Sequence, residues 1–223
     1  MSRPLDETAV RKVARRLGLV AMLGMLVATL GVFRGIQELR TPVDVGTLGI
    51  QEQEGNQRLS RVQQKVAREI VEAMQAHRPA ETVLAAANVV LSGLLALACL
   101  ALFTLRPSGA SLFTQAAIAN SVLAVAGFGL WVAKARAMVP VLQSHAAEVI
   151  QATAAGDPAL ANPEAARTAE LFVAAGPWLW VVFLFFLLLL ELGFFLVATR
   201  AVRKDDVRAL LAWAEEARQR DRE

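Results

Sequence analysis

The sequence predicts an all-α membrane protein with four transmembrane helices, a small helical extracytoplasmic cap and a cytoplasmic C-terminal helix. Two observations predict this fold class. Four apolar runs, at residues 17–33, 82–105, 111–133 and 174–198, are long enough or nearly so to cross a hydrocarbon core, which takes about 20 helical residues. The 223-residue chain is also 56% hydrophobic, with a mean hydropathy of +0.46, whereas soluble domains are roughly 45–50% apolar.

The runs and the polar stretches between them divide the chain into alternating membrane spans and aqueous segments. In chain order we expect a cytoplasmic N-terminus at residues 1–16, a first span at 17–35, an outer helical loop at 36–81, a second span at 82–105, a cytoplasmic turn at 106–110, a third span at 111–133, a second outer helical loop at 134–173, a fourth span at 174–199 and a cytoplasmic amphipathic tail helix at 200–223. The first run exceeds the apolar stretch of a signal peptide, and no small-x-small cleavage site follows it. We therefore expect an uncleaved span there.

The distribution of charge and of tryptophan predicts the orientation of the spans. Basic residues crowd into the two terminal segments, whereas acidic and basic residues nearly balance in the first outer loop. Because positive charge beside short segments favours the cytoplasmic side, both termini are predicted to be cytoplasmic. Trp131, Trp178 and Trp180 then all fall at the outer interface, where amphipathic rings prefer to lie. The arginine-rich, alanine-rich and tyrosine-free composition is typical of a GC-rich bacterial genome, which indicates a bacterial inner membrane.

The aqueous segments carry their own structural signals. Pro107 and Gly109 lie in a link so short that spans two and three must be antiparallel neighbours. Apolar residues recur at helical spacing in the first outer loop at Leu59, Val62, Val66, Ile70 and Met74. Pro79 should end or kink that helix.

The second outer loop contains a weaker amphipathic stretch at residues 141–154, and Asn162-Pro163 has the pattern of a helix N-cap and first turn. Two helices with apolar stripes on the same side of a membrane should pack together or lie on the lipid surface. A small cap is the simpler interpretation, and a cap that senses a ligand or binds a partner is the alternative.

The tail after Arg200 is predicted to continue the fourth helix, with Asp205 and Asp206 either interrupting it or capping a new turn. Two interpretations of its surface compete: an interfacial helix on anionic lipid and a docking helix for a partner. The candidate contact residues for lipid or partner are Arg203, Lys204, Leu210 and Trp213.

Glu191 is the strongest candidate for a functional residue, because it is a carboxylic acid inside the fourth apolar run. A charge in hydrocarbon costs about 2.5–3.5 kcal/mol on insertion scales, so this side chain should be neutral, paired or facing water. Helical rise places it about 13 Å from the inner boundary, at a depth similar to that of Asn120 and about one turn above Gln115. A hydrogen bond between Glu191 and either amide would clamp two helices together. Ion or proton conduction and contact with a membrane partner are the alternatives.

Small residues at four-residue spacing in the first three spans favour close helix packing there. They are Gly24 with Ala28, Ser92 with Ala96, and Ala117 with Ser121. The fourth span is bulky instead, as expected for a helix that faces lipid or a partner. Asn88 is predicted to make an interhelical hydrogen bond, and the single cysteine, Cys99, is predicted to be a buried apolar residue.

The sequence carries no glycine-rich phosphate loop, no HExxH, no recognisable nucleophile motif and no motif for nucleic-acid binding. His77 and His145 both belong to outer segments, so no span offers a histidine pair for haem, and His145 with Glu148 is too small a set for a metal site. We therefore expect no enzymatic activity, no catalytic residue, no cofactor and no metal.

Together these features predict a non-enzymatic structural or accessory subunit of a membrane complex or a homo-oligomer. Its expected partners are the lipid bilayer and a membrane protein or further copies of the chain, and no nucleic acid. The first alternative is a small channel or transporter component that uses Glu191 as a protonation or cation site. The second is a sensor of a periplasmic signal.

Overall fold

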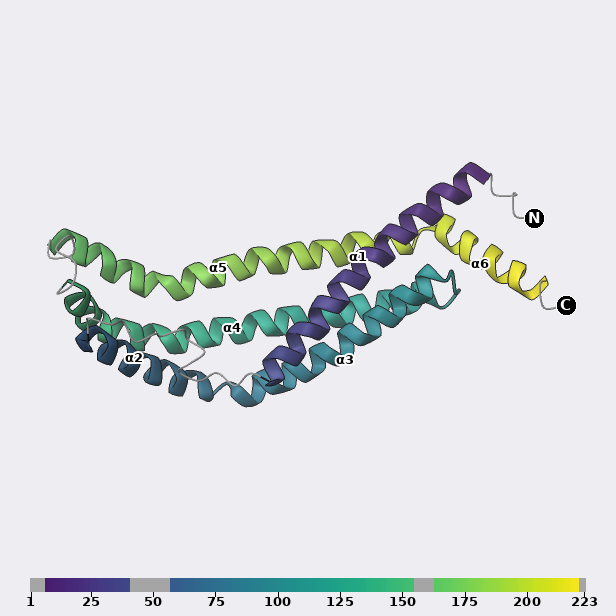
Figure 1. Ribbon diagram of the computed structural model, residues 1–223. Coiled ribbons are helices and arrows are strands. Elements are labelled where there is room, and N and C mark those ends of the chain that lie inside the picture. The colour runs from purple at the N-terminus through teal and green to yellow at the C-terminus, as the bar shows by residue number, and fades with distance from the viewer. Residues whose placement is uncertain (1–6, 41–56, 155–162, 221–223) are drawn as a thin grey trace. The chain divides into compact units, whose positions relative to one another are not determined.

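The computed structural model describes residues 7–40, 57–154 and 163–220, and all regular structure in these residues is helical (Figure 1). The helices are α1 (Glu7–Arg40), α2 (Gln57–Gln75), α3 (Arg78–Phe103), α4 (Gly109–Ala154), α5 (Pro163–Val202) and α6 (Asp205–Arg220). Four of them contain a stretch that is long and apolar enough to cross a membrane. These stretches are Val10–Arg40, Arg78–Phe103, Gly109–Glu148 and Ala175–Val202. The predicted all-α membrane fold is thus confirmed.

The chain divides into two compact units, each built from separate stretches of sequence. The first unit comprises Met1–Leu39, Val83–Ala126 and Leu188–Glu223, and the second comprises Arg40–Thr82 and Gly127–Leu187. Helices α4 and α5 contribute residues to both units. Each unit is therefore described by its own contacts.

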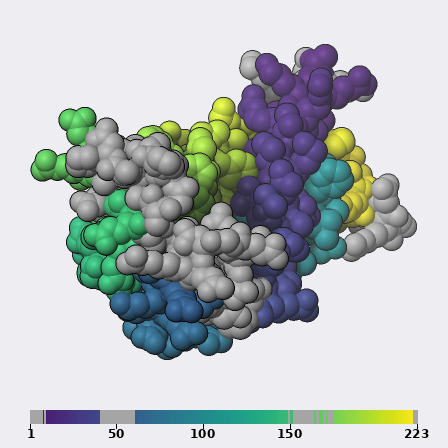
Figure 2. Space-filling view, turned by 60° about the vertical axis from the view of Figure 1, so that its left-hand side comes forward, coloured from purple at the N-terminus to yellow at the C-terminus, as the bar shows by residue number. Residues whose placement is uncertain are grey.

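The core of the first unit joins residues from α1, α3, α4, α5 and α6. Among its most buried side chains are Leu102 of α3, Phe113 of α4, Val202 of α5 and Val207 of α6, each with at most 1% of its surface exposed. The opposite side of α1 is apolar and uncovered, with Leu26, Leu30 and Phe33 each more than half exposed, and α1 is seen in purple in Figure 2. An apolar surface of this kind suits a helix in contact with lipid.

A tight turn joins α3 to α4, as the sequence predicts. Leu105 adopts a left-handed backbone conformation, with φ 52°, and Arg106 N–H donates to Ala101 O at 2.8 Å while Leu105 N–H donates to Leu102 O at 3.0 Å. This pair of bonds is the Schellman motif that closes a helix C-terminus. Helix α4 begins at Gly109, in close contact with the end of α3. A Cβ atom added at this glycine would lie 2.9 Å from backbone atoms of Ala101 and Leu102.

The fourth span ends before the tail helix begins. Helix α5 stops at Val202 and α6 starts at Asp205, with Asp206 Oδ1 accepting a hydrogen bond from Val207 N–H at 2.9 Å. Asp205 and Asp206 lie in the first turn of α6, where negative charge complements the helix dipole. The sequence predicted that Asp205 and Asp206 either interrupt the fourth helix or cap a new turn. In the structure they begin a new helix.

In the second unit, α2 runs antiparallel to the C-terminal half of α4 (Figure 1). Val66, Ala67 and Val71 of α2 and Ala146 and Ile150 of α4 are all buried. The buried face of α2 is centred slightly to one side of the predicted stripe, because Val62, Ile70 and Met74 are only partly covered. The two outer helical stretches therefore pack against each other.

The third span and the predicted outer helix at residues 141–154 form one continuous helix of 46 residues. At 1.5 Å per residue α4 is about 69 Å long, more than twice the roughly 30 Å of a hydrocarbon core. It passes through Pro140, which removes one donor from the helical ladder and crowds the carbonyl four residues before it. Pro163 likewise begins a helix that runs on into the fourth span, as predicted, and Asn162 lies outside the described residues.

Candidate functional site

One face of α5 is turned toward the helices of the first unit, and Glu191 lies on that face. Phe195, Ala198 and Val202 are buried, and Leu188 and Glu191 precede them at the same three- and four-residue spacing with half-buried side chains. The opposite face is bulky and uncovered: Phe186, Leu190 and Val197 are 60%, 70% and 67% exposed. Glu191 therefore faces the chain's own helices and not the surrounding lipid.

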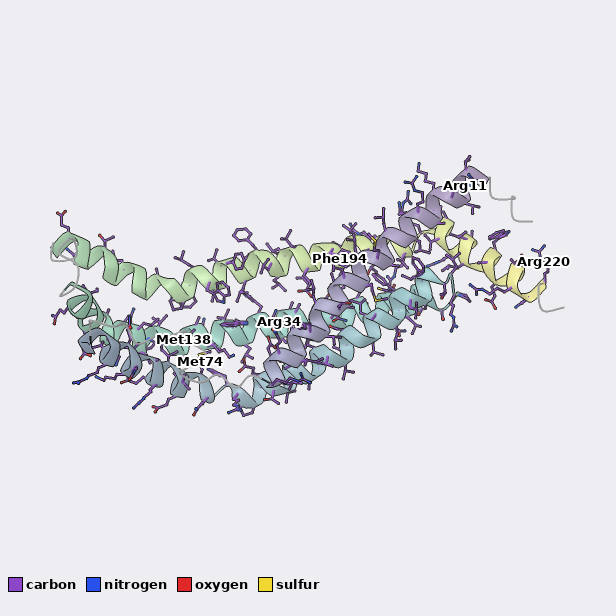
Figure 3. All side chains as sticks on the ribbon, viewed as in Figure 1. Arg11, Arg34, Met74, Met138, Phe194 and Arg220 are labelled. Atoms are coloured by element: carbon purple, nitrogen blue, oxygen red, sulfur yellow. The ribbon has the colours of Figure 1, made fainter. Side chains whose placement is uncertain are left out.

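The charge that acts on Glu191 comes from α1. The guanidinium of Arg34, which is labelled in Figure 3, interacts electrostatically with the Glu191 carboxyl group. Arg34 also donates from Nε to Glu38 Oε1 at 2.8 Å, within α1. Helix α1 continues through Arg34 to Arg40.

The two amides predicted to pair with Glu191 lie elsewhere. Asn120 is buried, and its Nδ2 atom donates to Leu91 O of α3 at 3.1 Å and to Ala116 O of its own helix at 2.9 Å. Gln115 is exposed. In the described part of the chain, no hydrogen bond joins either amide to Glu191. Asn120 does link two helices, but it links α4 to α3.

The interface between α1 and α3 holds a second polar cluster. Asn88 Nδ2 donates to Gly31 O at 3.0 Å, and Ser92 Oγ donates to Asn88 Oδ1 at 3.1 Å. The predicted interhelical role of Asn88 is therefore observed.

This interface is close because α1 presents glycines to α3. A Cβ atom at Gly24 would lie 2.6 Å from Cys99 Sγ, one at Gly35 would lie 2.9 Å from Ala85 O, and one at Gly31 would overlap Ser92 Oγ. Gly24, Ala28, Ser92 and Cys99 are buried, in agreement with the predicted close packing.

The predicted contact residues of the tail separate into two groups. Leu210 is 1% exposed and belongs to the core of the first unit with Val13 and Leu17 of α1. Arg203, Lys204 and Trp213 are exposed. Arg218 donates to Thr104 O and, at 2.9 Å, to Leu105 O, so the tail also satisfies carbonyl groups at the end of α3. The exposed members remain the candidate contacts for lipid or a partner.

The second unit contains two buried ionisable side chains, Lys134 and His145, whose contacts with Glu81 and Glu69 the sequence did not predict. Lys134 Nζ lies 2.5 Å from Glu81 Oε1 and 5.1 Å from the centre of the Trp131 ring, and the lysine side chain is 2% exposed. His145 is also buried and lies near Glu69 of α2. The only sequence signal for this arrangement is that Lys134 and His145 fall on one helical face with Met138 and Val141 between them.

Within residues 7–40, 57–154 and 163–220, no group of three or more His, Cys, Asp or Glu side chains is arranged to hold a metal ion. Neither a family model, nor a curated protein, nor a solved structure matches the chain.

Proposed function

We propose that this protein is a non-enzymatic structural or accessory subunit of a membrane complex or homo-oligomer. The observation that supports the proposal is that buried polar side chains of the spans form hydrogen bonds between helices. Asn88 bonds α3 to α1, and Asn120 bonds α4 to α3. Polar groups used in this way hold helices together in a membrane. They support a role in assembly more than a role in chemistry.

The exposed face of α5 is the surface that we assign to the partner. It is made of large apolar side chains, among them Phe183, Phe186 and Leu190, and its opposite face is already occupied by the chain's own core. Such a helix can exchange lipid for another apolar helix without breaking any contact within the chain. A second copy of the chain or a different membrane protein would fit this surface equally well.

The proposed site of action is a bacterial inner membrane, with both termini in the cytoplasm. The support for this orientation is the positive charge near the start of α1 and between α5 and α6. The exposed basic residues there are Arg11, Lys12, Arg15, Arg203 and Lys204. The ring positions of Trp178 and Trp180, at the start of the apolar part of α5, fit the opposite interface.

Native extraction tests the proposal directly. The full chain is extracted from its own membrane in polymer-bounded lipid discs, and the mass of the particle is measured by native mass spectrometry. We expect a stoichiometric partner or a homo-oligomer. The double variant Phe186→Ala/Leu190→Ala should release it, whereas Leu26→Ala/Leu30→Ala on the exposed face of α1 should not. A monomer without partner in the unmodified protein would overturn the proposal.

A second candidate function is supported by the inward position of Glu191. An acid inside an apolar helix that faces neighbouring helices is the arrangement expected of a protonation or cation site in a small channel or transporter component. The protein in liposomes should then carry a proton-linked flux, which Glu191→Gln abolishes because the amide does not titrate. A flux that survives this substitution would exclude the protonation-site version of this function.

A further inference from the structure

Exposed basic side chains gather at one end of the first unit, where α1 begins and α5 gives way to α6. This is the end of α1 that Figure 3 marks with Arg11. The start of α1 packs in one core with α6, because Val13 and Leu17 are buried together with Val207 and Leu210. Five exposed residues of these segments form what we call the basic surface: Lys12, Arg15, Arg200, Arg203 and Lys204.

The carboxylates beside the basic surface are paired with other cations. Asp206 lies 3.5 Å from Arg16, and Asp205 lies 3.8 Å from Arg208. In the part of the chain that the structure describes, no residue of the basic surface takes part in an ion pair. The basic surface therefore presents positive charge that the described chain does not neutralise with a carboxylate.

The basic surface continues the uncovered apolar faces of two spans. Along α1, Arg15 lies on the same helical face as Leu19 and Met22, and along α5, Arg200 lies one turn after Leu196. These three apolar side chains are each more than half exposed. Long basic side chains at the end of an apolar helix extend to the membrane interface. Arg15 and Arg200 thus lie where a surface suited to lipid tails ends and one suited to headgroups begins.

Helix α6 does not offer the surface that a partner helix would need. Helix-in-groove recognition requires a free apolar face, but the apolar face of α6 is already buried in the core of the unit. Its buried residues are Val207, Leu210, Leu211 and Ala214. The large apolar side chain of α6 that is exposed is that of Trp213, and an indole ring suits the membrane interface. The free contacts at this end are therefore ionic and interfacial, which favours lipid headgroups as the occupant.

We propose that the basic surface binds the headgroups of anionic phospholipids. The headgroup phosphate supplies the negative charge, and its oxygens accept hydrogen bonds from arginine and lysine. The attraction of basic residues to an anionic leaflet increases with their number and weakens as salt screens it. The site does not depend on the proposed role as a subunit, because the chain's own helices carry all five cations.

Lipid titration of the full chain tests the site. The purified protein in mild detergent is titrated with phosphatidylglycerol and, separately, with phosphatidylcholine of the same acyl chains. Native mass spectrometry gives the dissociation constant of the first bound lipid. We expect the anionic lipid to bind at least tenfold more tightly, which corresponds to about 1.4 kcal/mol. Equal affinities would overturn the proposal, since charges that only orient the helices during insertion require no such preference.

Three variants locate the preference. Arg200→Gln/Arg203→Gln/Lys204→Gln removes three of the five cations and should reduce the tenfold preference to twofold or less. Arg200→Lys/Arg203→Lys keeps the charge and should keep at least half of it. The matched control removes three exposed cations of the second unit and should leave the preference unchanged: Arg61→Gln/Arg68→Gln/Arg78→Gln. A preference that survives the first variant, or that the control loses to the same extent, would refute the site.

The double variant Lys12→Gln/Arg15→Gln provides the same test on α1 if the triple variant of α5 does not fold, and it should weaken the preference at least threefold. Two competitors separate lipid from other anions. Inorganic phosphate at the concentration of the lipid should not displace phosphatidylglycerol, because it has no acyl chains to hold it at the boundary. Displacement by inorganic phosphate, or tighter binding of a polyglutamate peptide than of the lipid, would assign the surface to a free anion or an acidic protein segment and refute the lipid site.

Discussion

The α1–α3 pair and the α2–α4 pair are both antiparallel and make contact at three- and four-residue spacing, but opposite chemistry holds them. In the first pair Gly31 and Gly35 let the helices approach until Asn88 bonds to a backbone carbonyl of α1. In the second pair ionisable groups meet: Glu69 with His145, and Lys65 with Glu148. The start of α3 adds a further ionic contact to this unit, from Glu81 to Lys134 of α4. Between apolar helices in a membrane there is little hydrophobic driving force, so close packing and hydrogen bonds must hold them.

Helix α2 is held in place by different forces from those between the apolar helices α1 and α3. It has an apolar stripe flanked by many charged side chains and is not among the helices apolar enough to cross a membrane. A helix of this kind can bury Val66 and Val71 against α4 by the hydrophobic effect. Its ionic contacts then select which partner and which register it adopts. The comparison indicates that backbone approach determines the α1–α3 contact, whereas charge pairing determines the α2–α4 contact.

The largest expected effect is on the buried ion pair of the second unit. Glu81→Gln should lower the free energy of unfolding by about 3 kcal/mol, because it leaves the ammonium group of Lys134 buried without its carboxylate. Lys134→Met should cost less, since Glu81 is 25% exposed and can be solvated. The measurement is helical circular dichroism during denaturation by SDS in mixed micelles.

The double variant Glu81→Gln/Lys134→Met completes the cycle and should be more stable than Glu81→Gln alone. The asymmetry between the two single variants is the critical result. If Lys134→Met proved as costly as Glu81→Gln, the buried charge would not be the source of the effect, and the contrast between the ionic contacts of the second unit and the α1–α3 contact would weaken.

The next effect concerns the close approach of α1 and α3. Gly31→Ala places a methyl group against Ser92 and should cost about 1–3 kcal/mol by overpacking. Adding Ser92→Gly should restore part of the loss. Gly93→Ala is the matched control, because a Cβ atom there meets nothing within 4 Å, and the better helix former should be neutral or stabilise by roughly 0.5–1 kcal/mol. Equal losses for Gly31→Ala and Gly93→Ala would show that helix propensity, and not close approach, is being measured.

Hydropathy and the positions of glycine and proline at helix boundaries predicted much of the fold. Apolar length identifies the four spans, Pro107 and Gly109 indicate the tight turn between the second and third, and Pro163 begins a helix where one was expected. The continuity of α4 was not predicted, because the apolar run stops at Ala133 and charge follows it. The helix nevertheless continues past the end of the apolar run. Its next residue is Lys134, and the ion-pair partner of Lys134, Glu81, lies 53 residues away in the sequence.

The candidate site was predicted less completely, because helical spacing gives depth and face but not the neighbouring helix. Helical rise predicts a similar depth for Glu191 and Asn120, but Asn120 is turned toward Leu91 of α3. The charge acting on Glu191 is that of Arg34, which sequence position alone places at the end of an apolar run. The small-residue pattern identified Gly24 and Ser92. Gly31 and Gly35 were not singled out, although they too are four residues apart, so the same spacing could have predicted their close approach to α3.

The smallest expected effect is that of salt, and it separates the two helix pairs within one sample. Raising the salt from about 0.05 M to about 1 M shortens the Debye length to about 3 Å. The pair between Lys65 and Glu148, with side chains 55% and 52% exposed, should then lose about 0.5 kcal/mol. Amide hydrogen exchange should become roughly twofold faster in the part of α2 around Lys65 and stay constant where Asn88 and Ser92 face α1. An equal acceleration in both places would mean that salt loosens the whole protein, and charge would no longer distinguish the α2–α4 contact from the α1–α3 contact.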